Sequence, residues 1–223
     1  MIWAIVPAKA LELAKTRLAG LLDLAERRAL VLAMLRDVLG ALRGVRALDG
    51  VMVVTRDEAV SAVASASGAE VLRETNVGQN EALEEALARC RWWGAAAVLL
   101  VSSDLPLLRP ATVEQVITQG MRGNLAGSVV LAPSRDGTGT NAMFQRPPGV
   151  LPLRFGASSL QQHQQAASEC GVRVDLVRTP DLALDIDTPA DLLEFVRCGG
   201  QSHTRGALGS MHLLERIPAY LTL

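Results

Sequence analysis

The chain has 223 residues and a formal net charge of −1, and hydrophobic residues make up 49% of it. This length suits one α/β domain or two small ones, and the composition is that of a packed domain rather than a disordered one. The near-neutral charge argues against a broad nucleic-acid or membrane surface, and no apolar run approaches the ~20 residues that cross a bilayer.

The cysteines and lysines are sparse. Cys90, Cys170 and Cys198 show no paired or metal-finger spacing, which predicts unpaired thiols and a cytoplasmic location. Only two of the 22 basic residues are lysines, Lys9 and Lys15. Both follow the first apolar run instead of preceding it, so the order is not that of a signal peptide.

Residues 2–6 predict a first strand, and the loop after it carries Lys9, Lys15 and Arg17. Three cations this close together after a strand could bind a triphosphate, with a solvated basic loop as the alternative. Neither a G-x-G-x-x-G sequence nor a Walker A sequence occurs in the chain. This argues against a dinucleotide dehydrogenase and a P-loop phosphotransferase.

Helical and apolar patterns then alternate. Helices are predicted from about residue 24 to 42, 57 to 67 and 81 to 91, and strands at 51–55, 69–72 and 98–101. This alternation predicts a right-handed βαβ series with a parallel sheet. Asn80, just before the third helix, is either its N-cap or a contact to a nucleoside.

The strand at 98–101 is followed by Asp104 and Pro106. In open α/β sheets, ligands bind outside the carboxyl ends of the strands. Asp104 is therefore a candidate ligand for a metal or a nucleotide. A simple turn at an Asp before an X-Pro pair is the alternative.

The second half predicts anion-binding loops. A helix is predicted after Pro110 and a strand at 128–132, and the polar loop 133–141 leads to an apolar run at 142–144, as a hairpin or as a loop across the site. The backbone amides of this loop, and those of the helix that begins near Ser159, could hold an anion. Ordinary turn chemistry and a serine N-cap are the alternatives, and His163 is interpreted as a polar helix residue rather than a catalytic base.

Asp185 and Asp187 follow a strand predicted at 172–177 and flank Ile186. In an extended segment both carboxylates project to the same side. They would repel each other without a cation, and Mg²⁺ commonly binds one or two carboxylates together with substrate phosphates. Thr188 and Pro189 predict the start of the last helix, with Asp191 placed to complement its dipole.

Several of these pieces occur in one order along about residues 1–196. Together they resemble the 2-phospho-L-lactate or phosphoenolpyruvate guanylyltransferase family of coenzyme F-420 biosynthesis, which is related to the molybdenum-cofactor guanylyltransferases. The matching pieces are Val6-Pro7-Ala8-Lys9, Ala14-Lys15-Thr16-Arg17-Leu18, Asp104-Leu105-Pro106, Gly139-Thr140-Asn141, Phe155-Gly156, Ser159, His163 and Leu184-Asp185-Ile186-Asp187-Thr188-Pro189.

The resemblance implies a three-layer α/β/α nucleotidyltransferase domain (Rossmann-like, with a mostly parallel sheet) over residues 1–196 and a C-terminal extension of unknown role over 197–223. It implies that GMP moves from GTP to the phosphate of a three-carbon acid, namely 2-phospholactate, phosphoenolpyruvate or 3-phosphoglycerate, with release of pyrophosphate. The partners implied are these small molecules, with no nucleic acid and no membrane, while a homo-oligomer stays open.

The same resemblance implies roles for individual residues. Asp104, Asp185 and Asp187 would hold Mg²⁺, while Lys9, Lys15 and Arg17 would bind the GTP phosphates and Asn80 the nucleoside. Thr140, Gly156 and Ser159 would bind the acceptor phosphate, with Thr138 as a nearby alternative. Asp104, Lys15 and Lys9 are the implied catalytic residues.

Two departures and two rival interpretations accompany the resemblance. Gln79 stands where the family commonly has Leu, and the chain continues further than usual beyond about Arg197. A molybdenum-cofactor or sugar-phosphate nucleotidyltransferase would usually have a glycine-rich first loop, which Pro7-Ala8-Lys9-Ala10 is not. A non-catalytic nucleotide-binding domain is not expected to keep all three carboxylates and both lysines.

Overall fold

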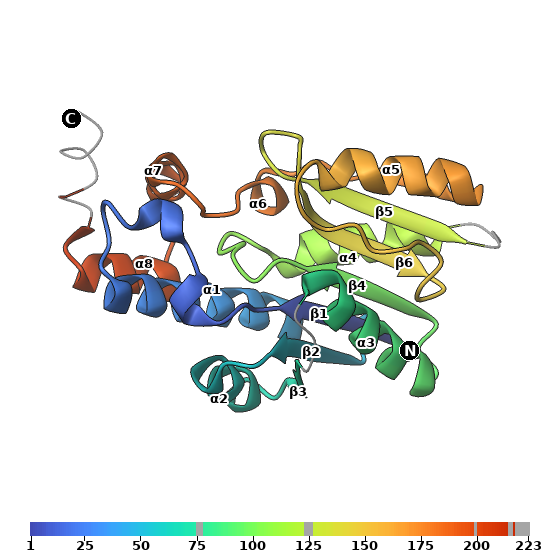
Figure 1. Cartoon of the computed structure of the whole chain (residues 1–223), viewed down its shortest axis with the longest axis horizontal. Helices are drawn as coiled ribbons and strands as arrows, with labels where there is room; N and C mark the ends of the chain where they lie inside the picture. Colours follow the sequence, from blue (N-terminus) through green and yellow to red (C-terminus); the bar gives the residue numbers. More distant parts are fainter. Residues whose placement is uncertain (75–77, 123–126, 199, 214–215, 217–223) are drawn as a thin grey trace.

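The computed structural model describes residues 1–74, 78–122, 127–198, 200–213 and 216 (Figure 1). In this part of the chain, seven strands form one sheet in the order β3-β2-β1-β4-β6-β5-β7. The strands are β1 Ile2–Pro7, β2 Gly50–Thr55, β3 Glu70–Arg73, β4 Ala97–Val101, β5 Ser128–Pro133, β6 Thr140–Arg146 and β7 Arg173–Leu176.

The sheet is mostly parallel. Strand β6 runs antiparallel to both of its neighbours, β4 and β5, and the other pairs are parallel. The apolar run at 142–144 is therefore one arm of a hairpin, and residues 134–139 form its loop. All five residues of β4 are buried, as expected for a strand in the middle of a covered sheet.

Helices cover both faces of the sheet (Figure 1). Alternate strand residues enter two separate hydrophobic clusters: Leu99 and Val101 pack with α1, α2 and α4, whereas Val98 and Leu100 pack with α3 and α5. The helices are α1 Leu24–Arg43, α2 Glu58–Ala66, α3 Gln79–Trp92, α4 Pro110–Met121, α5 Ser159–Cys170, α6 Pro180–Ala183, α7 Pro189–Arg197 and α8 His203–Ser210, with short 3-10 helices η1 Leu11–Leu13 and η2 Thr16–Leu18. The three-layer α/β/α prediction is confirmed, and none of the described helices is long and apolar enough to cross a membrane.

Polar side chains cap the helices that border the sheet's carboxyl edge. Asp57 accepts hydrogen bonds from two amides of the first turn of α2, and its other oxygen accepts one from the Leu11 amide at 3.1 Å. Thr188 and Asp191 form a reciprocal capping box on α7. These caps satisfy amides that helix ends leave without partners, and they fix the two loops that enter the site.

Two predictions about helix ends are wrong. Helix α3 begins at Gln79 with Gly78 as its N-cap, so Asn80 is not the cap. The helix that starts at Pro189 is not the last, because α8 follows it and packs on α1 (Figure 1). The backbone amides of His203 and Thr204 donate to the Asp37 carboxylate on α1, at 2.8 and 2.9 Å. At least this part of the tail therefore packs on the domain itself.

Candidate active site

Two acidic segments meet at the carboxyl edge of the sheet. The Ile186 amide donates to the backbone oxygen of Asp104 at 3.2 Å, so the turn after β4 lies against the segment between α6 and α7. Ile186 is fully buried, and Asp185 and Asp187 lie on either side of it. One carboxylate oxygen each of Asp104, Asp185 and Asp187 lies within 4.8 Å of the others.

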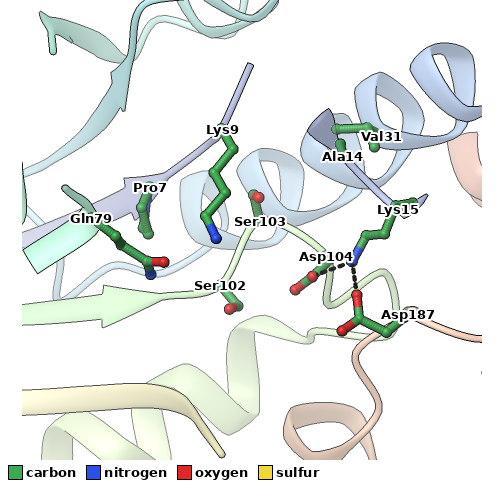
Figure 2. Close-up of a pocket in the computed structure, with 10 residues that line it drawn as sticks. All are labelled: Pro7, Lys9, Ala14, Lys15, Val31, Gln79, Ser102, Ser103, Asp104 and Asp187. Atoms are coloured by element: carbon green, nitrogen blue, oxygen red, sulfur yellow. Dashed lines mark hydrogen bonds and ion pairs between the residues drawn. The ribbon is translucent and has the colours of Figure 1, made fainter. Parts of the chain in front are cut away.

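Lys15 neutralises part of this cluster. Its ammonium group forms ion pairs with Asp104 and, at 2.6 Å, with Asp187 (Figure 2). Burial lowers the pKa of Lys15, but the charges of the two carboxylates outweigh burial and raise the pKa above its ordinary value. Lys15 is therefore a cation, held in a left-handed backbone conformation (φ 54°) that costs a non-glycine residue on the order of 1–2 kcal/mol and that tends to persist where function requires it.

Asp185 has a different environment. Its carboxylate accepts a hydrogen bond from the Asn141 side-chain amide at 3.0 Å, and the same amide donates to the Leu182 backbone oxygen at 3.0 Å. Burial raises the pKa of Asp185 despite the hydrogen bond. The Asp187 pKa is lowered instead, because Lys15, Arg17 and Lys9 together outweigh its burial.

The cluster fits a divalent cation. Oxygen donors are the ligands that Mg²⁺ prefers, and one carboxylate oxygen of Asp104 is buried with no hydrogen-bond partner in the structure. An unsatisfied buried carboxylate oxygen is costly, and a bound cation would satisfy it. The three carboxylates can therefore hold a divalent metal ion between them.

The cluster opens into two adjoining cavities of about 240 and 880 Å³. Lys9, Gln79, Ser102, Asp104 and Asp187 line both of them. Figure 2 shows the side chain of Lys9 reaching into this space between Gln79 on one side and Asp104 with Lys15 on the other. Arg17 lines the larger cavity, with its guanidinium 4.0 Å from Asp187. The predicted cations and carboxylates therefore share one site.

The predicted acceptor residues line the larger cavity. Thr140 comes from the start of β6, while Gly156 and Ser159 come from the loop before α5 and its first residue. Thr138 is less available, because both its amide and its hydroxyl donate to Asp136, at 3.0 and 2.9 Å. Hydrogen bonds from Ser134 and Thr138 lower the pKa of Asp136 to about 2, so this carboxylate is charged and keeps Thr138 bound.

Asn80 lies outside the lining of these two cavities. Its side-chain amide donates to the Phe155 backbone oxygen at 3.1 Å and accepts from the Phe155 amide at 2.9 Å. Asn80 thus clamps the loop that carries Gly156, and its neighbour Gln79 faces the cavity instead. The nucleoside contact of Asn80 stays a prediction.

Two residues that organise the site, Asn141 and His163, have no role that the sequence alone indicates. Both are buried polar residues, and a buried polar side chain needs hydrogen-bond partners. In the sequence, the only hint of such a residue was that the polar Asn141 directly precedes the apolar run at 142–144. Its partners could not be named without knowing that β6 lies beside the 182–185 segment.

Known proteins resemble this chain in sequence and in fold. The family model "Guanylyl transferase CofC like" matches residues 2–215. A phosphoenolpyruvate guanylyltransferase of Rubrobacter xylanophilus is 43% identical over 89% of this chain and 95% of its own length. The 2-phospho-L-lactate guanylyltransferase of Methanothermobacter thermautotrophicus is 37% identical over 91% of this chain and 87% of its own length.

Among solved structures, one from Desulfovibrio desulfuricans G20, provisionally described as a nucleotide-diphospho-sugar transferase, has a TM-score of 0.80 at 19% identity. It covers 98% of this chain and 97% of its own, and at this identity it shows the fold alone. The family match spans most of the chain, including the cavity residues named above. The chain therefore belongs to the CofC-like guanylyl transferase family, and it is a guanylyltransferase.

Proposed function

We propose that this enzyme transfers GMP from GTP to the phosphate of a three-carbon phospho-acid, with phosphoenolpyruvate as the first candidate, in coenzyme F-420 biosynthesis. The proposal rests on one observation above all: the Asp104, Asp185 and Asp187 cluster shares a cavity with Thr140 and Ser159. The name of the 43% identical relative favours phosphoenolpyruvate. The 2-phospholactate and 3-phosphoglycerate alternatives differ from it by small chemical changes at the carbon skeleton.

The cationic side of the site would receive the triphosphate. Lys9 and Arg17 are exposed on the loop after β1 and can approach the phosphates, while Lys15 holds Asp104 and Asp187 in place. Gln79 lines the cavity beside Lys9 and is the α3 side chain placed to meet the nucleoside. The hydrogen bonds between Asn80 and Phe155 would hold α3 against the loop that carries Gly156.

Mg²⁺ on the three carboxylates would neutralise phosphate charge and make the α-phosphorus more electrophilic. Thr140, Gly156 and Ser159 would hold the acceptor phosphate so that one of its oxygens faces the α-phosphorus of GTP. That oxygen forms the new P–O–P bond as the bond between the α- and β-phosphates breaks, and pyrophosphate leaves with the electron pair. Catalysis would come from positioning and charge stabilisation, without a covalent enzyme intermediate.

The acceptor is tested by offering the three acids separately. Purified protein is incubated with GTP and Mg²⁺ plus phosphoenolpyruvate, 2-phospholactate or 3-phosphoglycerate, and the guanylated acid is detected by mass spectrometry together with pyrophosphate. We expect guanylated phosphoenolpyruvate to form fastest, with equal amounts of pyrophosphate. Product with another acid alone would correct the acceptor, and no product with any of the three, while GTP still binds, would refute the proposed function.

A further inference from the structure

His163 is a fully buried residue of α5 that contacts two separate segments of the larger cavity. Its Nδ1 lies 3.1 Å from the Thr140 hydroxyl oxygen, and its Nε2 accepts a hydrogen bond from the Arg154 backbone amide at 2.9 Å. The Phe155 ring packs edge-on against the imidazole, with ring centroids 4.9 Å apart. Both ring nitrogens are therefore engaged by the protein.

These contacts fix the tautomer of His163. A backbone N–H can only donate, so Nε2 must be the unprotonated nitrogen. The proton of the neutral ring is then on Nδ1, where it donates to the Thr140 hydroxyl oxygen. Burial, assisted by the charge of Arg154, lowers the pKa of His163 to about 4, so the ring is neutral at pH 7.

The tautomer in turn orients the Thr140 hydroxyl. Because its oxygen accepts a hydrogen bond from His163, its own hydrogen points elsewhere, and Thr140 lines the cavity. A hydroxyl held in this way is a preorganised donor, and the ligand that suits a donor is an anionic oxygen. The same imidazole anchors Arg154, two residues before Gly156 of the predicted acceptor site.

We propose that His163 is a positioning residue that presents the Thr140 hydroxyl as a hydrogen-bond donor to the phosphate of the acceptor acid. This inference rests on the proposed function, which supplies the phosphorylated acceptor. His163 itself performs no proton transfer, because neither ring nitrogen is open to the substrate. Its effect on catalysis passes through the Thr140 hydroxyl.

Two substitutions separate the two contacts. In His163→Asn the amide can take the place of Nδ1 and keep a donor to Thr140, whereas in His163→Gln the amide oxygen can take the place of Nε2 and keep an acceptor for Arg154. Thr140→Val removes the hydroxyl at nearly constant volume. His203→Gln on α8, away from the cavity lining, serves as the control.

We expect H163Q and T140V each to raise the KM for the acceptor about tenfold, the scale of one lost hydrogen bond, while the KM for GTP stays within about twofold. H163N should raise the acceptor KM less than H163Q does, and H203Q should change neither KM. The H163Q/T140V double variant should be no worse than T140V alone, because His163 acts through that hydroxyl. The proposal would be overturned if the effects of H163Q and T140V on the acceptor KM multiply in the double variant. Equal effects of H163N and H163Q, or a parallel rise in the KM for GTP, would also overturn it.

The tautomer of His163 is tested by a measurement that needs no activity assay. Nitrogen-15 NMR of the wild-type protein at pH 7, with the His163 signals assigned by their loss in H163Q, reports which ring nitrogen carries the proton. We expect a protonated Nδ1 and an unprotonated Nε2, and the opposite tautomer would refute the role of His163 even in a fully active enzyme. If the tautomer is as expected but no acid is guanylated, the proposed function fails and the acceptor role fails with it, whereas the geometry stands.

Discussion

At the scale of single residues, the carboxylate cluster holds more negative charge than its one buried ammonium group can neutralise. The carboxylates of Asp104, Asp185 and Asp187 lie close together, and Lys15 pairs with two of them, Asp104 and Asp187. Close carboxylates repel each other in a medium of low dielectric. The cluster therefore has an electrostatic need for a further cation, which is the physical basis for proposing a metal ion there.

The sequence was sufficient to predict these carboxylates but not the residues that organise the site around them. Asp185 and Asp187 alternate around a buried Ile, and the rule that alternate residues share a side was enough. Asn141 contacts Asp185, which lies 44 residues away along the chain, and His163 contacts Thr140, which lies 23 residues away. Such contacts depend on which elements become neighbours, and local patterns do not contain that information.

His163 also gives the protein a defined loss of stability in acid. Its pKa is lowered from 6.5 to about 4, so between these values the unfolded chain binds a proton that the native protein does not. The free energy of unfolding should therefore fall as the pH drops from 6.5 to 4, by about 3 kcal/mol from this group. Urea unfolding at a series of pH values measures this dependence.

The matched comparison is H163Q, which has no titrating group at this position. Its free energy of unfolding should fall less steeply than that of the wild type between pH 6.5 and 4, whatever its absolute stability. Equal slopes for the two proteins would mean that the pKa of His163 is the same in the native protein as in the unfolded chain.

At the scale of elements, most strand and helix positions followed from periodicity, whereas the start of α3, the place of β6 and the helix α8 did not. Gly78 caps α3, and a Cβ there would lie 1.7 Å from a carboxylate oxygen of Glu81, which folds back over the glycine. Asn80 has the better intrinsic capping propensity, but it is used to hold Phe155. A tertiary contact thus outweighed a local preference.

We expect Gly120→Ala on α4 and Gly40→Ala on α1 to have opposite effects on the free energy of unfolding, because only Gly120 packs closely against the sheet. A Cβ at Gly120 would lie 2.2 Å from the ring of Phe144, which is fully buried on β6. Overpacking of this kind costs about 1–3 kcal/mol, more than the ~1 kcal/mol that alanine gains over glycine in a helix. We expect Gly120→Ala to lower the free energy of unfolding, as measured by urea denaturation.

Gly40 on α1 is the matched control. A Cβ at Gly40 would have no atom within 4 Å, so the helix propensity acts alone and Gly40→Ala should stabilise the protein by about 0.5–1 kcal/mol. If both substitutions stabilise, the packing of α4 against Phe144 is looser than described.

At the scale of the whole molecule, the sheet's carboxyl edge collects residues from widely separated parts of the chain. The loop after β1, the turn after β4, the start of β6, the loop before α5 and the segment before α7 all reach one cavity. The parallel arrangement made this convergence predictable. The boundary of a domain at residue 196 stays a prediction, although Leu208 and Leu213 of the tail are buried in the same core cluster as α1.

We propose that the carboxylate cluster is the catalytic centre of guanylyl transfer. The rate of pyrophosphate release from GTP and phosphoenolpyruvate in Asp104→Asn measures this role, because the substitution keeps the shape of the side chain and removes its charge. Glu70→Gln, an exposed position on β3, is the control. Thermal unfolding of each variant shows whether the fold is kept, because Lys15 loses one of its two ion-pair partners in Asp104→Asn.

We expect Asp104→Asn to remain folded and to lose about 100-fold or more in kcat/KM, in line with removal of one strong charge-stabilising group, while Glu70→Gln retains the wild-type rate. A folded Asp104→Asn enzyme with a kcat/KM within about threefold of the wild type would show that the chemistry does not depend on the cluster.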